Sequence, residues 1–220
     1  MSFDLDSNSV KTTNMLKAYS GNPSHWTVLQ GSILDEQFFR TLEPADVVYC
    51  WGVLHHTGAM WQAMDNTARL MKDETILYIA LYDYDIQVNP PAEFWLEVKQ
   101  RYNRSGWLAK KYMVGWYILE FVLYKNWQKI PDLIQRIAGY KRSEVVGYKQ
   151  SKIVGYKRSR GMAFFTDIVD WLGGWPMEFA KRADVKDWAE KLNLTMVTMK
   201  TGEANTEYLF KRRHLLDSPS

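Results

Sequence analysis

Polar residues follow the first two short apolar segments of the chain. Asp4 and Asp6 follow the first segment, where a carboxylate can accept both hydroxyl groups of a ribose. Asp35 follows the second segment, and Ser32 and Ile33 precede it with backbone and side-chain groups suited to a purine edge. Each carboxylate could instead cap a helix, which is the commoner role of an isolated Asp. Their ordered occurrence in one chain favours a ligand site.

The next two apolar segments end in residues with different chemistry. Cys50 and Trp51 end the third segment, and Tyr82 ends the fourth. His55 and His56 follow the third segment closely, and imidazole titrates near neutral pH, so either one could act as a general base. The alternatives are that one histidine caps or orients its loop, and that Tyr82 only packs.

The sequence lacks the patterns of metal, disulfide and membrane proteins. Two adjacent histidines and one cysteine do not have a usual ligand spacing, so we expect no metal. A single cysteine fits a reducing compartment, which predicts a cytoplasmic protein. The most apolar stretch, 112–124, contains Glu120 and is well short of the ~20 residues that span a bilayer. The acidic start does not resemble a signal peptide.

Alternating strands and helices are predicted to position the polar residues. Strands are expected at 1–5, 26–29, 46–51 and 75–82, and helices at 7–17, 35–42 and 60–71. The segment 46–51 is almost entirely apolar, which predicts a strand buried on both faces. Strands that alternate with helices indicate βαβ units and a parallel sheet, whose ligands lie beyond the carboxyl ends of the strands.

A helical segment follows the strands. Helices are predicted at 94–102, at 107–126 and from Pro131, and later at 166–172 and 185–192. The helix at 107–126 is apolar almost all round, so it should be largely covered. Two further strands are predicted at 194–199 and 207–210.

Positive charge is concentrated in one block. Residues 1–98 hold 5 basic and 13 acidic side chains, whereas residues 99–160 hold 15 basic and 3 acidic ones. This block includes three copies of a basic, tyrosine-containing octad at 139–162. Its eight-residue period is too short for a solenoid, which favours a tandem duplication in a surface loop. The alternative is an arm that associates weakly with anionic surfaces such as nucleic acid or membrane.

Four blocks of the sequence carry a family resemblance. They are SFDLDSNSV at 2–10, WTVLQGSILDEQFF at 26–39, DVVYCWGVLHHTGAMWQAM at 46–64 and RGMAFFTDIVDWLGGWPMEFA at 160–180. They resemble class I S-adenosylmethionine-dependent methyltransferases, specifically the small-molecule and quinone-type enzymes. The resemblance implies an α/β fold: a Rossmann-like, mostly parallel sheet with a helical cap insertion and a last antiparallel strand.

The resemblance also implies an activity and a site. The expected reaction is methyl transfer from S-adenosylmethionine to a small organic molecule, with His55, His56 and Tyr82 as the catalytic candidates. The residues expected to bind the cofactor are Asp4, Asp6, Ser32, Ile33, Asp35, Cys50 and Trp51. The residues expected to line the substrate pocket are Asp170, Trp171 and Glu178. The rival hypothesis is a non-catalytic module that acts through its basic segment.

The sequence departs from the family pattern at its N-terminal end. The family places a first strand and a glycine-rich turn before the point that matches Met1, and no G-x-G-x-x-G-like segment occurs in this sequence. An incomplete gene, a late start, or a second chain or dimer that completes the sheet are the possible explanations. The expected parts are a truncated cofactor-binding part at 1–89, a cap at 90–138, the repeat loop at 139–162, and C-terminal helices and strands at 163–220.

Overall fold

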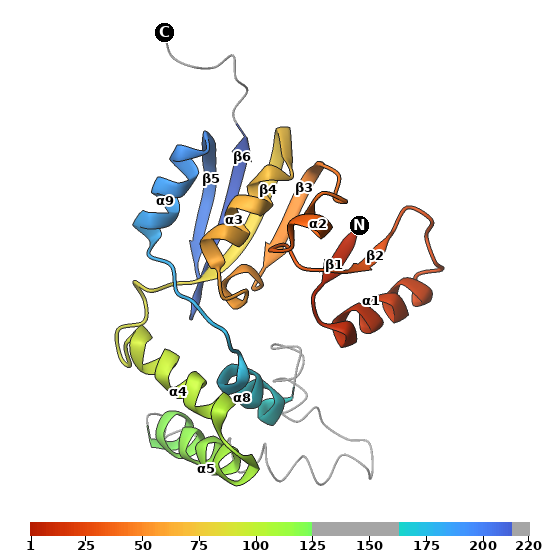
Figure 1. The fold of residues 1–220 in the computed structure, drawn as a ribbon. Coiled ribbons are helices and arrows are strands. Elements are labelled where there is room, and N and C mark those ends of the chain that lie inside the picture. Colours follow the sequence, from red (N-terminus) through yellow and green to blue (C-terminus); the bar gives the residue numbers. More distant parts are fainter. Residues whose placement is uncertain (125–162, 213–220) are drawn as a thin grey trace, which may run out of the picture. The chain divides into compact units, whose positions relative to one another are not determined.

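The computed structural model describes residues 1–124 and 163–212, which form two compact units (Figure 1). The first unit comprises Met1–Ala92 and Pro176–Ser220, and the second comprises Glu93–Trp175. The helical segment is therefore an insertion between two parts of the sheet-containing unit.

Several predicted features lie outside the described residues. These are the octad repeat at 139–162, the helix expected from Pro131 and most of the basic block at 99–160. The association of the basic block with anionic surfaces therefore stays a prediction.

The first unit has two hydrogen-bonded sheets among its described residues. The smaller sheet pairs β1 (Ser2–Asp4) in parallel with β2 (Val28–Gln30). The strands of the larger sheet are β3 (Ala45–Trp51), β4 (Met71–Tyr82), β5 (Leu194–Thr201) and β6 (Asn205–Arg212). Their spatial order is β3–β4–β6–β5. β3 runs parallel to β4, whereas β6 is antiparallel to both of its neighbours, which confirms the predicted fold class with its last antiparallel strand.

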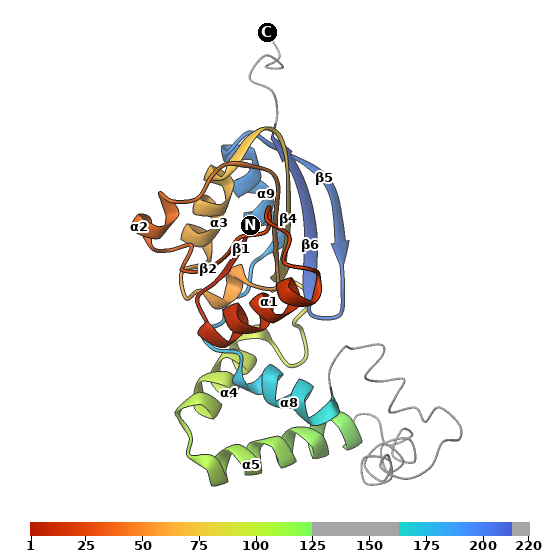
Figure 2. The ribbon, with the colours of Figure 1, turned by 90° about the vertical axis from the view of Figure 1, so that its right-hand side faces the viewer.

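Helices cover one face of the four-stranded sheet. α3 (Met60–Arg69) and α9 (Arg182–Lys191) lie on the same side of it (Figure 2). The two helices and the sheet share one apolar core. Alternate residues of β4 point into this core because side chains of a strand point to opposite faces in turn. The largest fully buried apolar side chains of this core include Leu54, Met60, Met64, Leu77, Ile79, Leu81, Val185, Tyr208 and Phe210.

The opposite face of this sheet carries exposed apolar side chains. Val47, Tyr49 and Trp51 of β3 are 62%, 66% and 46% exposed, whereas Val48 between them is buried. The prediction that 46–51 is buried on both faces is therefore wrong. The segment is apolar on both faces, but α3 and α9 both pack on one of them.

Each strand of the smaller sheet is followed by a helix: α1 (Ser7–Tyr19) follows β1, and α2 (Glu36–Phe39) follows β2. The ring of Phe3 in β1 packs edge-on against Phe38 of α2, with centroids 5.3 Å apart. Phe39 and Leu42 extend this contact into the core beside α3. Helix α1 begins after Asp6, whose carboxylate accepts the Ser9 N–H and so caps the helix.

The second unit is helical. Its described elements are α4 (Ala92–Arg104), α5 (Trp107–Tyr117), a π-helical continuation (Ile118–Tyr124) and α8 (Phe164–Gly173). Tyr102 and Leu172 are among its buried residues. The prediction that 107–126 is largely covered is wrong for the described part, where Trp107 and Tyr112 are exposed. None of the helices in 1–124 and 163–212 combines the length and apolarity needed to cross a membrane.

Candidate functional site

Three of the predicted site residues close strands of the first unit. Asp4 is the last residue of β1, Trp51 the last of β3 and Tyr82 the last of β4. In each parallel pair the carboxyl ends lie at the same edge. Because ligands of parallel α/β sheets bind beyond these ends, the strand ends define the candidate site.

The two carboxylates at the end of β1, Asp4 and Asp6, have different surroundings. Asp6 is exposed, and its Oδ2 accepts hydrogen bonds from the backbone N–H of Ser9 at 2.8 Å and from the Ser9 hydroxyl at 3.1 Å. The Ser9 bonds hold the pKa of Asp6 below its usual value. Asp4 is half-buried, and its Oδ1 accepts the Asp6 N–H at 2.8 Å. Its Oδ2 accepts no hydrogen bond from residues 1–124 or 163–212, so Asp4 is the carboxylate available to a ligand.

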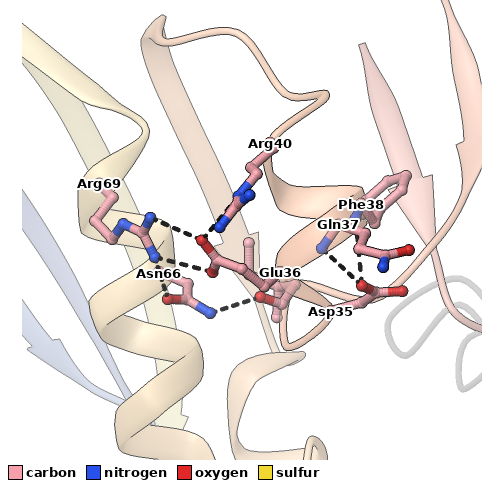
Figure 3. A network of polar contacts seen from close by, with 8 residues as sticks. Asp35, Glu36, Gln37, Phe38, Arg40, Asn66 and Arg69 are labelled. Atoms are coloured by element: carbon pink, nitrogen blue, oxygen red, sulfur yellow. Dashed lines mark hydrogen bonds and ion pairs between the residues drawn. The ribbon is translucent and has the colours of Figure 1, made fainter.

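The loop after β2 is held against α3 (Figure 3). The side-chain amide of Asn66, which is buried in α3, donates to the Ile33 carbonyl at 2.8 Å. Asp35 caps α2 because its Oδ1 accepts the Gln37 N–H at 2.9 Å. The Ser32 hydroxyl accepts the Leu34 N–H. These bonds position the N–H of Ile33, which donates to no other described residue, beside the strand ends.

An ion pair also joins α2 to α3. Glu36 of α2 lies 3.4 Å from Arg69 of α3 and 3.5 Å from Arg40 (Figure 3). Neither Asn66 nor this ion pair was predicted from the sequence. The only sequence signal was one amide within the apolar face of the predicted helix 60–71.

Cys50 and Trp51 point to opposite faces of β3. Burial raises the pKa of the Cys50 thiol to about 11, so this thiol stays protonated at neutral pH. The Trp51 indole N–H donates to Glu207 Oε1 at 3.1 Å on the exposed face. Any contact of Cys50 with a ligand beyond the strand end must therefore come from its backbone. Within the described part of the chain, no three His, Cys, Asp or Glu side chains are grouped as metal ligands.

His55 and His56 lie in a short 3-10 turn after β3 and differ in role. His55 is 2% exposed, and its Nδ1 lies 3.3 Å from the Tyr82 N–H, which donates to it. The proton of a neutral His55 is therefore on Nε2. The His55 ring packs 4.3 Å from the Tyr82 ring. His55 thus joins the turn to the end of β4 and positions its neighbours.

His56 is half-buried at the edge of this cluster. Its Nδ1 lies 2.8 Å from the Pro176 carbonyl, which can only accept, so Nδ1 carries the proton. In the neutral ring the lone pair is then on Nε2. The His56 ring also lies 5.7 Å from the Tyr82 ring, edge to face. The structure thus brings all three predicted catalytic residues together.

The predicted substrate residues divide between the two units. Glu178, in the first unit, accepts the Met60 N–H at 2.8 Å and so caps α3, which has no capping side chain of its own. Asp170 and Trp171 lie on α8 in the second unit. The Trp171 carbonyl there accepts a hydrogen bond from the buried Lys99.

A buried polar cluster at the end of β4 was not predicted from the sequence. Asp83 is 1% exposed and accepts a hydrogen bond from the Thr206 hydroxyl at 2.5 Å. Its carboxylate also lies 3.4 Å from Arg182 Nε, at the start of α9. Asp83, the residue that follows Tyr82 in the sequence, therefore links β4, β6 and α9. The sequence signal was only an Asp after an apolar strand.

Comparisons with known proteins give a match in structure alone. No family model and no curated protein matches this sequence. PKMT2 from Rickettsia typhi, solved in complex with AdoHcy, matches with a TM-score of 0.54 at 9% identity, over 96% of this chain and 44% of that one. The sheet order and this match show the fold of the class I S-adenosylmethionine-dependent methyltransferases, as the four sequence blocks predict.

Two more solved structures are similar at lower scores. An O-methyltransferase family protein from Burkholderia thailandensis matches with a TM-score of 0.49 at 11% identity, over 96% of this chain and 42% of that one. The O-methyltransferase NcsB1 from neocarzinostatin biosynthesis matches with a TM-score of 0.45 at 9% identity, over 96% and 41%. The chain thus spans less than half the length of these proteins.

Proposed function

We propose that this chain binds S-adenosylmethionine at the carboxyl ends of β1, β2 and β3 and transfers a methyl group to a small organic molecule. The observation that carries the proposal is the arrangement of the strand ends in this fold: Asp4 ends β1, and His56, whose Nδ1 is bound to the Pro176 carbonyl, lies in the turn after β3. When bound, S-adenosylmethionine supplies an electrophilic methyl group on a positively charged sulfur. A location in the cytoplasm stays a prediction.

The strand ends suit the chemistry of this cofactor. The Asp4 carboxylate retains an oxygen for ribose hydroxyls, and the Ile33 N–H can donate to a purine nitrogen. Asn66 and the Asp35 cap fix the loop that presents Ile33. Asp6 stabilises the start of α1 and contributes no direct contact in this proposal.

His56 supplies the acid–base chemistry of the proposed reaction. A neutral hydroxyl is a weak nucleophile, and His56 Nε2 accepts its proton as the oxygen reacts. His55 and Tyr82 hold the turn, and the Pro176 carbonyl stabilises the imidazolium that forms because it accepts a hydrogen bond from the Nδ1–H. The main contribution of the remaining residues is to orient the substrate.

The Asp4→Ala variant is expected to bind S-adenosylhomocysteine at least about tenfold more weakly, because it loses a charged acceptor for the ribose. Isothermal titration calorimetry on the 220-residue chain measures this. The matched control is Asp6→Ala, which removes the same charge two residues away and should change affinity less than about threefold. Equal affinities in the parent and the Asp4→Ala variant would refute the ribose assignment.

The His56→Gln variant is expected to lower kcat for methyl transfer about 100-fold, because glutamine cannot accept the substrate proton. The assay follows labelled methyl from S-adenosylmethionine to a panel of small phenols. Affinity for S-adenosylhomocysteine should be unchanged. A variant that retains full kcat contradicts the base assignment without affecting the cofactor proposal.

The rival module hypothesis gives the opposite binding results. Salt-sensitive binding to RNA or anionic vesicles, with no heat from S-adenosylhomocysteine, would favour it. The same calorimetry therefore separates the two classes of function.

A further inference from the structure

A short backbone segment holds the turn that follows β3. We define the strap as residues 176–180, which lie between α8 and α9 in the chain (Figure 1). The Ala180 N–H donates to the Tyr82 carbonyl at 2.9 Å, and the Tyr84 N–H donates to the Ala180 carbonyl at 2.9 Å. Ala180 is thereby paired in parallel with Asp83. One end of the strap is therefore fixed to the chain at the end of β4.

The other end of the strap is bonded to the turn and to the start of α3. The Pro176 carbonyl accepts from His56 Nδ1 at 2.8 Å, and the Glu178 N–H donates to the His55 carbonyl at 2.9 Å. Glu178 Oε1 accepts the Met60 N–H at 2.8 Å. The strap thus holds the chain on both sides of His56.

The side chain of Glu178 supplies a cap that α3 otherwise lacks. The residue before this helix is Ala59, which has no side-chain acceptor for the N–H groups of the first turn. These groups have no partners within a helix, and a carboxylate beside them is favoured by the helix dipole. Because Glu178 also bonds to the His55 carbonyl through its own N–H, its carboxylate ties the strap to α3 and to the turn together.

We propose that Glu178 is a positioning residue for His56. By capping α3 it keeps the strap against the turn, so that the Pro176 carbonyl holds the proton of the neutral His56 ring on Nδ1. This role differs from the pocket-lining role predicted from the sequence. The catalytic consequence rests on the proposed function, whereas the hydrogen bonds that hold the ring do not.

A small movement of the strap is enough to release the ring. An increase of about 1 Å in the 2.8 Å separation between His56 Nδ1 and the Pro176 carbonyl would break this bond, because hydrogen bonds of this kind extend only to about 3.2 Å. A neutral imidazole without an acceptor at Nδ1 can place its proton on either nitrogen. The tautomer of His56 therefore reports whether the strap is in place.

The test is ¹⁵N NMR of the histidine side chains in the 220-residue chain at about pH 8, where histidine is ordinarily neutral. The His56 signals are those that disappear in His56→Gln. In the parent chain we expect neutral His56 to be protonated on Nδ1. In Glu178→Ala the share of His56 protonated on Nε2 should rise at least about tenfold, because the strap loses its tie to α3.

Three further substitutions separate the cap from a general loosening of α3. Glu178→Gln keeps an oxygen for the Met60 N–H and should keep His56 protonated on Nδ1. Glu178→Asp shortens the side chain by one methylene and should give an intermediate share, which also provides a milder variant if Glu178→Ala does not fold. Asp65→Ala removes a carboxylate of α3 that accepts the Trp188 indole N–H at 2.8 Å, and it should leave the His56 tautomer unchanged.

Three outcomes would overturn the proposal. One is a parent chain with His56 protonated on Nε2. Another is an unchanged tautomer in both Glu178→Ala and Glu178→Asp. The third is an equal change in Asp65→Ala, which would show that any loosening of α3 moves the ring.

The tautomer measurement needs neither S-adenosylmethionine nor a substrate, so it is independent of the proposed function. If His56 is the base, Glu178→Ala should also lower kcat about tenfold at unchanged affinity for S-adenosylhomocysteine. A changed tautomer with full kcat would refute the base assignment and leave the positioning role of Glu178 intact.

Discussion

The free energy of unfolding of the Asp83→Ala variant is expected to be about 3 kcal/mol lower than that of the parent chain. The substitution removes a buried carboxylate that two other residues contact. The Thr206 hydroxyl and Arg182 Nε both contact the Asp83 carboxylate. Without it, the buried Thr206 hydroxyl loses its closest acceptor, and β4, β6 and α9 lose their common link. Urea denaturation followed by circular dichroism measures the change.

Asp85 provides the matched control for this prediction. It carries the same charge and binds the same Arg182, at 3.2 Å, but it is exposed. Its carboxylate also accepts the Arg182 backbone N–H at 2.9 Å, which holds the pKa of Asp85 below its usual value. Asp85→Ala should therefore cost only about 1 kcal/mol. Equal losses in the two variants would show that burial of Asp83 contributes nothing.

Lys99 is predicted to make the free energy of unfolding of the second unit change with pH above about pH 7. Its side chain is buried, donates to the Trp171 carbonyl and lies 4.0 Å from the centre of the Trp171 ring. That carbonyl is in the last turn of α8, where backbone acceptors lack helical partners, so the amine caps the helix. Burial lowers the pKa of Lys99 to about 7, although the nearby Asp170 opposes this shift.

The direction of the pH effect follows from proton binding. Between pH 7 and 10.5 the folded chain holds Lys99 largely neutral, whereas the unfolded chain holds it protonated. The unfolded state then binds more protons, so the free energy of unfolding should rise with pH, by up to about 1.4 kcal/mol per pH unit. Below pH 7 both states are protonated and this contribution is constant. Urea denaturation from pH 6 to 10 measures the slope.

Two substitutions separate Lys99 from other titrating groups. Lys99→Met should abolish the slope between pH 7 and 10, because methionine fills the space without titrating. Lys111→Met removes an exposed lysine from α5 in the same unit and should leave the slope unchanged. A slope that persists in Lys99→Met assigns the pH dependence to another group.

The strands of the sheet and their polar ends could be predicted from the sequence. Apolar β-favouring segments separated by helices define β1 to β4, and the residues that end them follow directly from the chain. The clustering of His55, His56 and Tyr82 was predictable for the same reason, since consecutive parallel strands bring their ends together. These inferences need only local periodicity and the geometry of parallel sheets.

The roles of individual polar residues could not be predicted in this way. Asp4 and Asp6 look equivalent in the sequence, yet Asp6 is used as a helix cap and Asp4 keeps one oxygen available. Glu178 caps α3 although it lies 118 residues from Met60. A hydrogen bond between distant segments has no local pattern, so it becomes visible only when the chain is folded.

The sequence by itself determined the fold class and the strand ends at which the candidate site lies, because hydrophobic periodicity specifies elements and their order. The tertiary structure alone decided the tautomers of His55 and His56, since each tautomer depends on a partner from a distant segment, Tyr82 or Pro176. It also decided that β3 is covered on one face only, because burial depends on where helices from distant parts of the chain pack.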